Sequence, residues 1–288
     1  MTVASRAQTS TMKMEVRING LAGQLCSLVL LGGDTVATLK AQLSLQEKIS
    51  PSEQQLLSGE KLLEDGQRLD QTLELLEAPE PPDKIAVAEV TLVRRSQEIG
   101  RWIDRVKADW ASFLKAPAEA RDCSDVVIEA VKKSGALLRY ASADVKKNRE
   151  VALAAVSQNG LALEFVDPSL RDDYEVVLRA VAVNGMALEF ASDRAKDDRI
   201  VIQTAVQKTG DALQFASLRL RSDFSFMLPF VSRDGLQVKY VSDSLRADPE
   251  LVVIGILKNR KAYQYCHPSI KYNSLILRAM GIDPDDAA

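Results

Sequence analysis

The chain has 288 residues, of which 46% are hydrophobic, enough for one large domain or two ordinary ones. Its net charge is only −3, and residues 97–288 carry 27 basic and 27 acidic side chains. Neither part of the chain is therefore a strongly basic module of the kind that binds nucleic acid or an acidic membrane.

Three scattered cysteines, Cys26, Cys123 and Cys266, argue against a disulfide framework and against a zinc site. Such a pattern is typical of a reducing compartment. The first eleven residues are rich in Ser and Thr and lack an apolar segment, so we expect a disordered tail over 1–11 and no secretory signal. No apolar run approaches the roughly 18 residues of a membrane span. We expect a cytoplasmic or nuclear protein with no membrane contact.

The N-terminal part predicts a small sheet with one helix. From Met14 the residues alternate as in a half-buried strand, and a turn at 20–23 leads to a second strand over 25–31. Thr35 is a candidate N-cap for a helix over 36–47. Strands over 54–57 and 85–93 follow, with an acidic, proline-containing loop at 76–83 between them.

This order of elements resembles ubiquitin over residues 12–96. The resemblance is carried by Thr35-Val36-x-x-Leu39-Lys40, by Pro51-x-x-Gln54-Gln55-x-Leu57 and by Gly59-x-x-Leu62-x-Glu64-Asp65-Gly66. It implies a β-grasp fold. Ubiquitin ends in a Gly-Gly tail that is conjugated, whereas here Val93-Arg94-Arg95-Ser96 runs on into more protein. We therefore expect a ubiquitin-like module that is never attached to other proteins.

Ubiquitin binds its receptors through an apolar patch, and the matching positions are Leu21, Leu57 and Val93. An exposed apolar cluster on a small domain marks a partner site, so the resemblance implies binding to ubiquitin receptors. The alternative is that Leu21 merely lies in a turn and that Val93 packs on the following helix.

Residues 97–121 predict a linker helix and an N-terminal cap. Apolar residues at helical spacing indicate one amphipathic helix over 97–114. We expect Trp102 and Trp110 to cover the first repeat, which is a commoner role for such a stripe than a cofactor or base-stacking site.

Residues 122–280 repeat a unit of 25 residues about six times. Glycines recur at Gly135, Gly160, Gly185, Gly210 and Gly235; aromatic residues recur at Tyr140, Phe165, Phe190, Phe215, Tyr240 and Tyr265. A third column holds Asn148, Asp173, Asp198, Asp223, Asp248 and Asn273. Three columns in one frame indicate a tandem repeat array.

One unit reads as a short helical hairpin. Asp173 is a candidate N-cap for a helix of about ten residues, and Gly185 is expected to end it in a left-handed conformation. A shorter second helix follows through Phe190. Hairpins this short must stack to bury their apolar faces. The last copy has Arg260 in the glycine column, so we expect a different turn there, then an acidic tail over 281–288.

The fold class is therefore α+β: a β-grasp domain followed by an all-α solenoid of helical-hairpin repeats. The repeats resemble the uncharacterised family domain of unknown function 4116 over residues 122–280, and this resemblance implies no mechanism.

A further column is entirely basic: Lys146, Arg171, Lys196, Arg221, Arg246 and Lys271. Stacked repeats would align these cations in a ladder able to bind a polyanion, such as RNA, or an acidic segment of a partner. The alternative is charge complementarity with the Asp and Asn caps two residues further on. The neutral net charge of the repeats favours this alternative, so nucleic acid is not the expected partner.

No residues form a convincing catalytic, cofactor or metal site. His267 is the only histidine and has no second ligand nearby in the sequence, and the glycines are solitary rather than grouped in a phosphate-binding loop. We expect a non-enzymatic interaction adaptor whose ubiquitin-like module contacts the ubiquitin and proteasome pathway. Polyanion binding and an inert structural scaffold are the alternatives.

Overall fold

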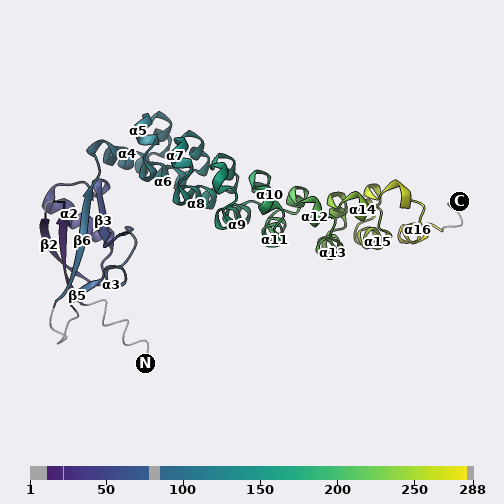
Figure 1. Cartoon of the computed structure of the whole chain (residues 1–288), viewed down its shortest axis with the longest axis horizontal. Helices are drawn as coiled ribbons and strands as arrows, with labels where there is room; N and C mark the ends of the chain where they lie inside the picture. Colours follow the sequence, from purple (N-terminus) through teal and green to yellow (C-terminus); the bar gives the residue numbers. More distant parts are fainter. Residues whose placement is uncertain (1–11, 22, 78–84, 284–288) are drawn as a thin grey trace, which may run out of the picture. The chain divides into compact units, whose positions relative to one another are not determined.

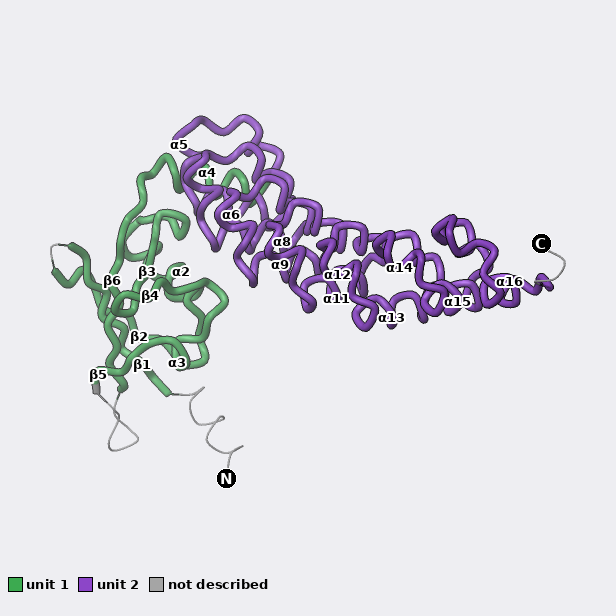
Figure 2. The backbone as a smooth tube through the Cα atoms, turned by 45° about the vertical axis from the view of Figure 1, so that its right-hand side comes forward, with its two compact units in different colours: residues 1–109 green, residues 110–288 purple. Residues whose placement is uncertain are grey.

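The computed structural model describes residues 12–21, 23–77 and 85–283 (Figure 1). The predicted tail over 1–11, most of the acidic loop at 76–83 and most of the tail over 281–288 lie outside the described residues. Two compact units divide the chain, residues 1–109 and residues 110–288 (Figure 2).

The first unit is a mixed sheet with a helix packed on one face. Its strands are β1 (Lys13–Gly20), β2 (Gly23–Leu31), β3 (Gln54–Ser58), β4 (Lys61–Leu62), β5 (Leu75–Glu77) and β6 (Ala86–Arg94). They lie in the order β2-β1-β6-β3-β4, with β5 beside β6. Strands β1 and β6 are parallel and the other pairs antiparallel. This is the predicted β-grasp arrangement.

The core of this unit follows from the predicted alternation. Met14, Val16 and Ile18 on β1 are fully buried and pack with apolar residues of helix α2 (Val36–Glu47). Thr35 caps this helix by accepting a hydrogen bond from the Thr38 N–H, as expected. The structure adds short elements that were not predicted: η1 (Pro51–Glu53), β4, α3 (Leu69–Thr72) and β5.

Helix α4 (Gln97–Ala108), within the segment predicted as linker helix and cap over 97–121, belongs to the first unit. Gly100 lies against η1, where a Cβ atom would stand 2.6 Å from Cγ of Glu53. The Ser52 hydroxyl donates a 2.9 Å hydrogen bond to Asp104. Trp102 therefore lies outside the repeat unit.

The predicted helix over 97–114 ends at Ala108, and the second unit begins with the 3₁₀ helix η2 (Trp110–Lys115). Within η2 the fully buried side chain is Phe113, whereas Trp110 is 45% exposed. Phe113, rather than the tryptophan pair, fills the core at this end.

The second unit is the predicted solenoid, and each repeat contains three helical segments rather than two. Ten-residue helices come first: α6 (Ser124–Lys133), α8 (Arg149–Gln158), α9 (Tyr174–Val183), α11 (Arg199–Lys208), α13 (Phe224–Arg233) and α15 (Pro249–Lys258). Six-residue 3₁₀ helices follow: η3 (Gly135–Tyr140), η4 (Gly160–Phe165), η6 (Gly185–Phe190), η7 (Gly210–Phe215), η8 (Gly235–Tyr240) and η9 (Arg260–Tyr265).

The third segment is a single short turn in each repeat. These turns are α5 (Ala118–Arg121), α7 (Ala143–Lys146), η5 (Pro168–Leu170), α10 (Asp193–Lys196), α12 (Leu218–Arg221), α14 (Asp243–Arg246) and η10 (Pro268–Ile270), and α16 (Ser274–Ala279) closes the array. Figure 1 shows the ten-residue helices along one side of the unit and the short turns along the other.

The predicted caps are confirmed. Asp173 accepts hydrogen bonds from the N–H groups of Glu175 and Val176, which would otherwise lack partners at the start of α9. A second capping column, not predicted, starts the 3₁₀ helices. Asn184, for example, accepts from the Met186 N–H.

The predicted left-handed glycine turn is wrong. Among the described residues positive φ angles occur only at Lys48, Gly23, Gly59 and Gly281, so the repeat glycines do not need this conformation. Instead, a Cβ atom at Gly160 would lie less than 3.0 Å from the main-chain oxygen of Ala180 in the next repeat. Glycine is required because successive repeats approach backbone to backbone.

The last repeat also shows that this turn does not need a glycine. The residue before Arg260, Asn259, has φ −152 and ψ 111, close to φ −145 and ψ 113 at Asn184. The expected different turn is therefore wrong. Arg260 is exposed, and its guanidinium donates to the main-chain oxygen of Met280.

Candidate protein-interaction surfaces

The residues that match the ubiquitin patch lie on the sheet face away from the core. Leu57 pairs with Thr91 and Gln55 pairs with Val93, so Leu57 and Val93 are diagonal neighbours on adjacent strands. Both are half-buried, while Leu56 and Leu92 between them point into the core.

Leu21 follows β1 and is 97% exposed. Because β1 runs parallel to β6 with Asn19 opposite Thr91, Leu21 leaves the sheet at the end that Val93 reaches. The structure thus places Leu57 and Val93 on one face of the sheet and Leu21 beyond the same end of it, and the binding role of all three stays a prediction.

A fourth apolar residue, Leu62, belongs to this face and was missed. It lies on β4 directly opposite Leu57 and is 42% exposed. Opposite residues of an antiparallel pair point to the same face. The signal in the sequence was the tight turn after Ser58, which sets this pairing.

The chain that leaves β6 is held against the sheet. Arg94 forms a 2.9 Å ion pair with the buried Glu53, and the Arg95 guanidinium donates to the main-chain oxygens of Ser52 (3.1 Å) and Gln54 (3.2 Å). The strand therefore continues through an anchored segment into α4.

The basic column is partly built into the repeats. All six side chains are half-buried. The Lys146 ammonium donates to the Arg139 oxygen at 2.9 Å, and Arg171 donates to the Glu164 oxygen at 2.8 Å. Both acceptors lie seven residues earlier, near the end of the preceding 3₁₀ helix, where a cation stabilises the carbonyl groups.

The main chain of this column also joins neighbouring repeats. The first five basic residues, from Lys146 to Arg246, each accept through the carbonyl oxygen a hydrogen bond from an N–H 21 residues later, as from Ser192 to Arg171 at 3.0 Å and from Ser217 to Lys196 at 2.9 Å. These contacts favour a structural role for the column, and polyanion binding stays a prediction.

The cations that pair with the Asp caps between repeats are Arg149 and Arg199, and not the expected cations of the basic column. Asp173 binds Arg149 of the preceding repeat at 2.8 Å, and Asp223 binds Arg199 in the same way. The hydrogen bond from Arg149, together with those from two backbone N–H groups, holds the pKa of Asp173 below its usual value of 3.8. One carboxylate therefore caps a helix and ties two repeats together.

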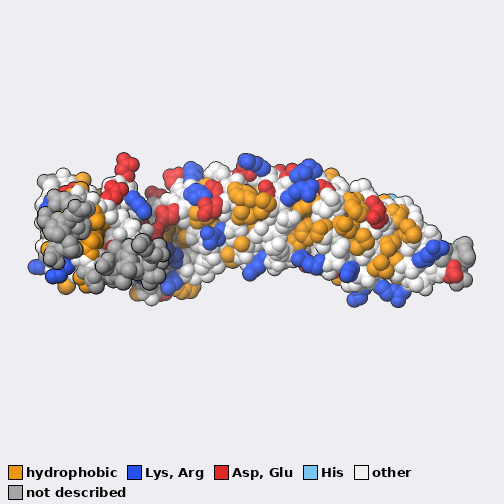
Figure 3. Space-filling view, turned by 90° about the horizontal axis from the view of Figure 1, so that it is seen from below, with side chains coloured by type: hydrophobic (Ala, Val, Ile, Leu, Met, Phe, Trp, Pro, Cys, Tyr) orange, Lys and Arg blue, Asp and Glu red, His pale blue; other side chains and the backbone are white. Residues whose placement is uncertain are grey.

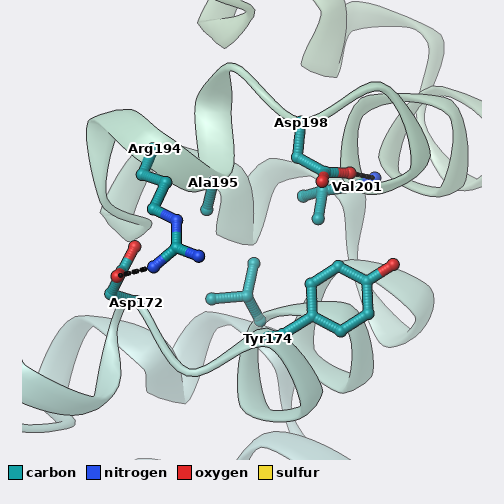
Figure 4. Close-up of a pocket in the computed structure, with 7 residues that line it drawn as sticks. Asp172, Tyr174, Arg194, Ala195, Asp198 and Val201 are labelled. Carbon is teal, nitrogen blue, oxygen red and sulfur yellow. Dashed lines mark hydrogen bonds and ion pairs between the residues drawn. The ribbon is translucent and has the colours of Figure 1, made fainter.

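The pocket in Figure 4 lies between α9, α10 and α11 and has a volume of only about 70 Å³. Arg194 points at Asp172 and pairs with it at 3.2 Å, and Asp198 turns its carboxylate to the Val201 N–H at the start of α11. Small-molecule sites are usually about 300 Å³ or larger. The pocket is therefore a small gap between stacked repeats rather than a small-molecule site.

Cys26 and Cys266 are buried, and His267 caps a short helix. Burial raises the pKa values of Cys26 and Cys266, which keeps both thiols protonated. His267 caps η10, with its Nδ1 atom 2.7 Å from the Ser269 hydroxyl. Within the described part of the chain, no cluster of three or more His, Cys, Asp or Glu side chains is arranged to hold a metal. In the same part, no helix has the length and apolar character needed to cross a membrane.

Two family models match the chain. The model described as Domain of unknown function (DUF4116) matches five overlapping segments, 123–171, 148–194, 173–221, 198–237 and 223–271, which together span just over half of the sequence. The ubiquitin family model matches residues 16–74. No curated protein matches the chain. A ubiquitin-like domain followed by tandem helical repeats fits a protein-interaction module.

Proposed function

We propose that this chain, which belongs to the DUF4116 family, is a non-enzymatic adaptor in which a ubiquitin-like module and a repeat solenoid each bind a protein. The ubiquitin-like module would engage a ubiquitin receptor, and the solenoid would hold a second protein on its extended surface. The free cysteines agree with a cytoplasmic or nuclear protein.

The observation that carries this proposal is the apolar face around Leu57 and Val93. Leu62, which is 42% exposed, extends this face, and Leu21, which is 97% exposed, lies beyond the same end of the sheet. Leucines so exposed have no role in the core, and several of them close together on a small domain are typical of a partner site.

The route of the chain after β6 supports a role in binding rather than in conjugation. Ubiquitin-type conjugation uses a free, flexible terminus, whereas here the residues after Val93 are anchored by Arg94 and Arg95 and continue into α4. The module would therefore act as a permanent receptor ligand within its own chain.

The test is a titration of the whole chain, labelled at Leu and Val methyl groups, with the ubiquitin-binding helix of a proteasomal ubiquitin receptor. We expect shifts at Leu21, Leu57, Leu62 and Val93. Leu21→Asp should weaken binding about tenfold or more, because a charge would lie on the apolar contact.

Leu45→Asp is the matched control, because Leu45 is 85% exposed on helix α2, away from the proposed face. It should leave the affinity unchanged. An absence of shifts at these four residues, or an equal loss in both variants, would contradict the proposed receptor contact.

A further inference from the structure

The last two α-helices of the array line an apolar groove. The groove has a volume of about 730 Å³ and is lined by Pro249, Glu250, Val253, Ile254 and Leu257 of α15 and by Leu275, Arg278 and Ala279 of α16. Leu257 is 70% exposed and Leu275 is 53% exposed. Figure 3 shows hydrophobic side chains gathered toward this end of the repeat unit, with acidic atoms among them and basic side chains at the edge.

This groove is a property of the last repeat and not of the repeat itself. The positions that match Leu257 in the earlier repeats hold small or polar residues, namely Lys132, Ser157, Ala182, Gln207 and Ser232. Stacking of the repeats therefore does not require a leucine at this column. An exposed leucine here needs another explanation.

The groove carries one acid and one base, on different helices. Glu250 lies on α15 and Arg278 on α16, and both are exposed. The matching Glu175 pairs with Arg149, but the residue that could pair with Glu250 in the same way is Phe224. Over residues 12–21, 23–77 and 85–283, neither Glu250 nor Arg278 forms an ion pair.

We infer that this groove binds the same groove of a second copy of the chain, around a two-fold axis. In a two-fold interface one patch faces itself, so the patch must be complementary to its own image. An axis midway between Glu250 and Arg278 brings each Glu250 opposite the partner subunit's Arg278. The apolar floor then covers the exposed leucines of both copies.

The charges favour a second copy over an unrelated partner. A patch with charges of one sign would repel its own image, whereas one acid and one base satisfy each other twice across the axis. Eight residues line the groove, whereas a standard interface has about 20 to 30 residues a side. We therefore expect a concentration-dependent dimer rather than an obligate one.

The first test is sedimentation velocity of the full chain from micromolar to sub-millimolar concentration. We expect a monomer–dimer equilibrium that Leu257→Asp shifts to monomer. The matched control is Leu218→Asp, because Leu218 is 64% exposed on α12 and lies outside the groove. A wild-type chain that stays monomeric throughout, or a dimer indifferent to Leu257→Asp, overturns the inference.

The second test exchanges the two charges. Glu250→Arg and Arg278→Glu should each raise the dimer dissociation constant about tenfold or more, since like charges then face each other. The double variant restores both pairs and should return within about threefold of the wild type. Single variants without effect, or a double variant no tighter than the singles, overturn the two-fold pairing. Circular dichroism of each variant distinguishes lost association from lost folding.

Discussion

The glycines of the repeats are needed because they lack a side chain, not because they allow unusual backbone angles. At Gly160 and its equivalents the main chain of the next repeat comes so close that a methyl group would overlap the oxygen of Ala180. Gly210 is the exception, because the nearest atom to its added Cβ would be Nε2 of Gln237 at 3.3 Å. This difference provides a matched pair of substitutions.

Gly160→Ala should lower the free energy of unfolding by about 1–3 kcal/mol, because the added methyl group must displace backbone. Gly210→Ala should be neutral or stabilise by up to about 1 kcal/mol, because alanine reduces the freedom of the unfolded chain and the nearby amide can move. Urea denaturation of both variants measures this. Equal effects would contradict a spacing role for Gly160.

Carboxylates with lowered pKa values predict sensitivity to acid. Ion pairs and hydrogen bonds, such as those from Arg149 to Asp173 and from Ser217 and Arg219 to Asp197, hold these pKa values below 3.8. These carboxylates therefore stabilise the folded state at any pH above their pKa in the unfolded chain. This stabilisation is lost as the pH falls through about 4 toward their pKa values in the folded state. Stability should be nearly level above about pH 5 and fall below it.

The control for this prediction is Arg149→Gln. It removes the cation from Asp173, so the variant should be less stable than the wild type at neutral pH. The two stability curves should converge in acid, where Asp173 is protonated in both proteins. Denaturant midpoints measured across the pH range would reveal this, and parallel curves would rule out the proposed linkage.

At the scale of elements, the contact between α11 and α13 departs from the others. The column that holds Ala155, Ala180 and Ala205 holds Phe230 in α13. Pro229 lies inside this helix, and the buried Gln237 leaves its Oε1 atom without a partner among the described residues. The repeats therefore meet less closely here.

Gln237→Leu tests whether the unpaired Oε1 atom of Gln237 weakens the contact between α11 and α13. Leu137 occupies the matching position of an earlier repeat, so the side chain fits the fold. Removing a buried acceptor without a partner should stabilise the protein by about 1 kcal/mol. The hydrogen bond that Gln237 donates to Asp234 is lost, but Asp234 is exposed and can bind water instead. A marked destabilisation in thermal unfolding would show that Gln237 has a partner in solution.

At the scale of the molecule, each repeat contacts only its neighbours, so stability is a sum of repeats and interfaces. The looser interface should divide the solenoid into two blocks, residues 122–222 and 223–280. Native-state hydrogen exchange should show one opening free energy for the backbone amides of each block. A single value for all repeats would contradict this division.

Much of this architecture could be predicted because it follows from short-range patterns. Helix α2 begins and ends where its cap and periodicity indicated, and the Asp column caps helices as expected. The role of Gly160 could not be predicted, since it depends on an atom twenty residues away. The close packing of α4 on η1 depends similarly on a residue distant in sequence, because Gly100 lies against Glu53.

Three residues of the candidate site could be predicted from the sequence, but their arrangement could not. The resemblance to ubiquitin identified Leu21, Leu57 and Val93, but the addition of Leu62 required the register of β3 and β4. The groove between α15 and α16 could not be predicted from the repeat columns, because it depends on residues that the repeats do not share. Leu257 matters because it breaks the pattern.

The main-chain hydrogen bonds between repeats have a consequence for how such a protein changes in length. Every donor and acceptor of this type recurs with the 25-residue period, as between Ser192 and Arg171 and again between Ser217 and Lys196. Duplication or loss of one whole unit therefore recreates a junction already present in the chain, whereas an insertion of any other length breaks it. A gene encoding this array can grow or shrink in steps of one repeat, and the protein's reach along its surface changes with it.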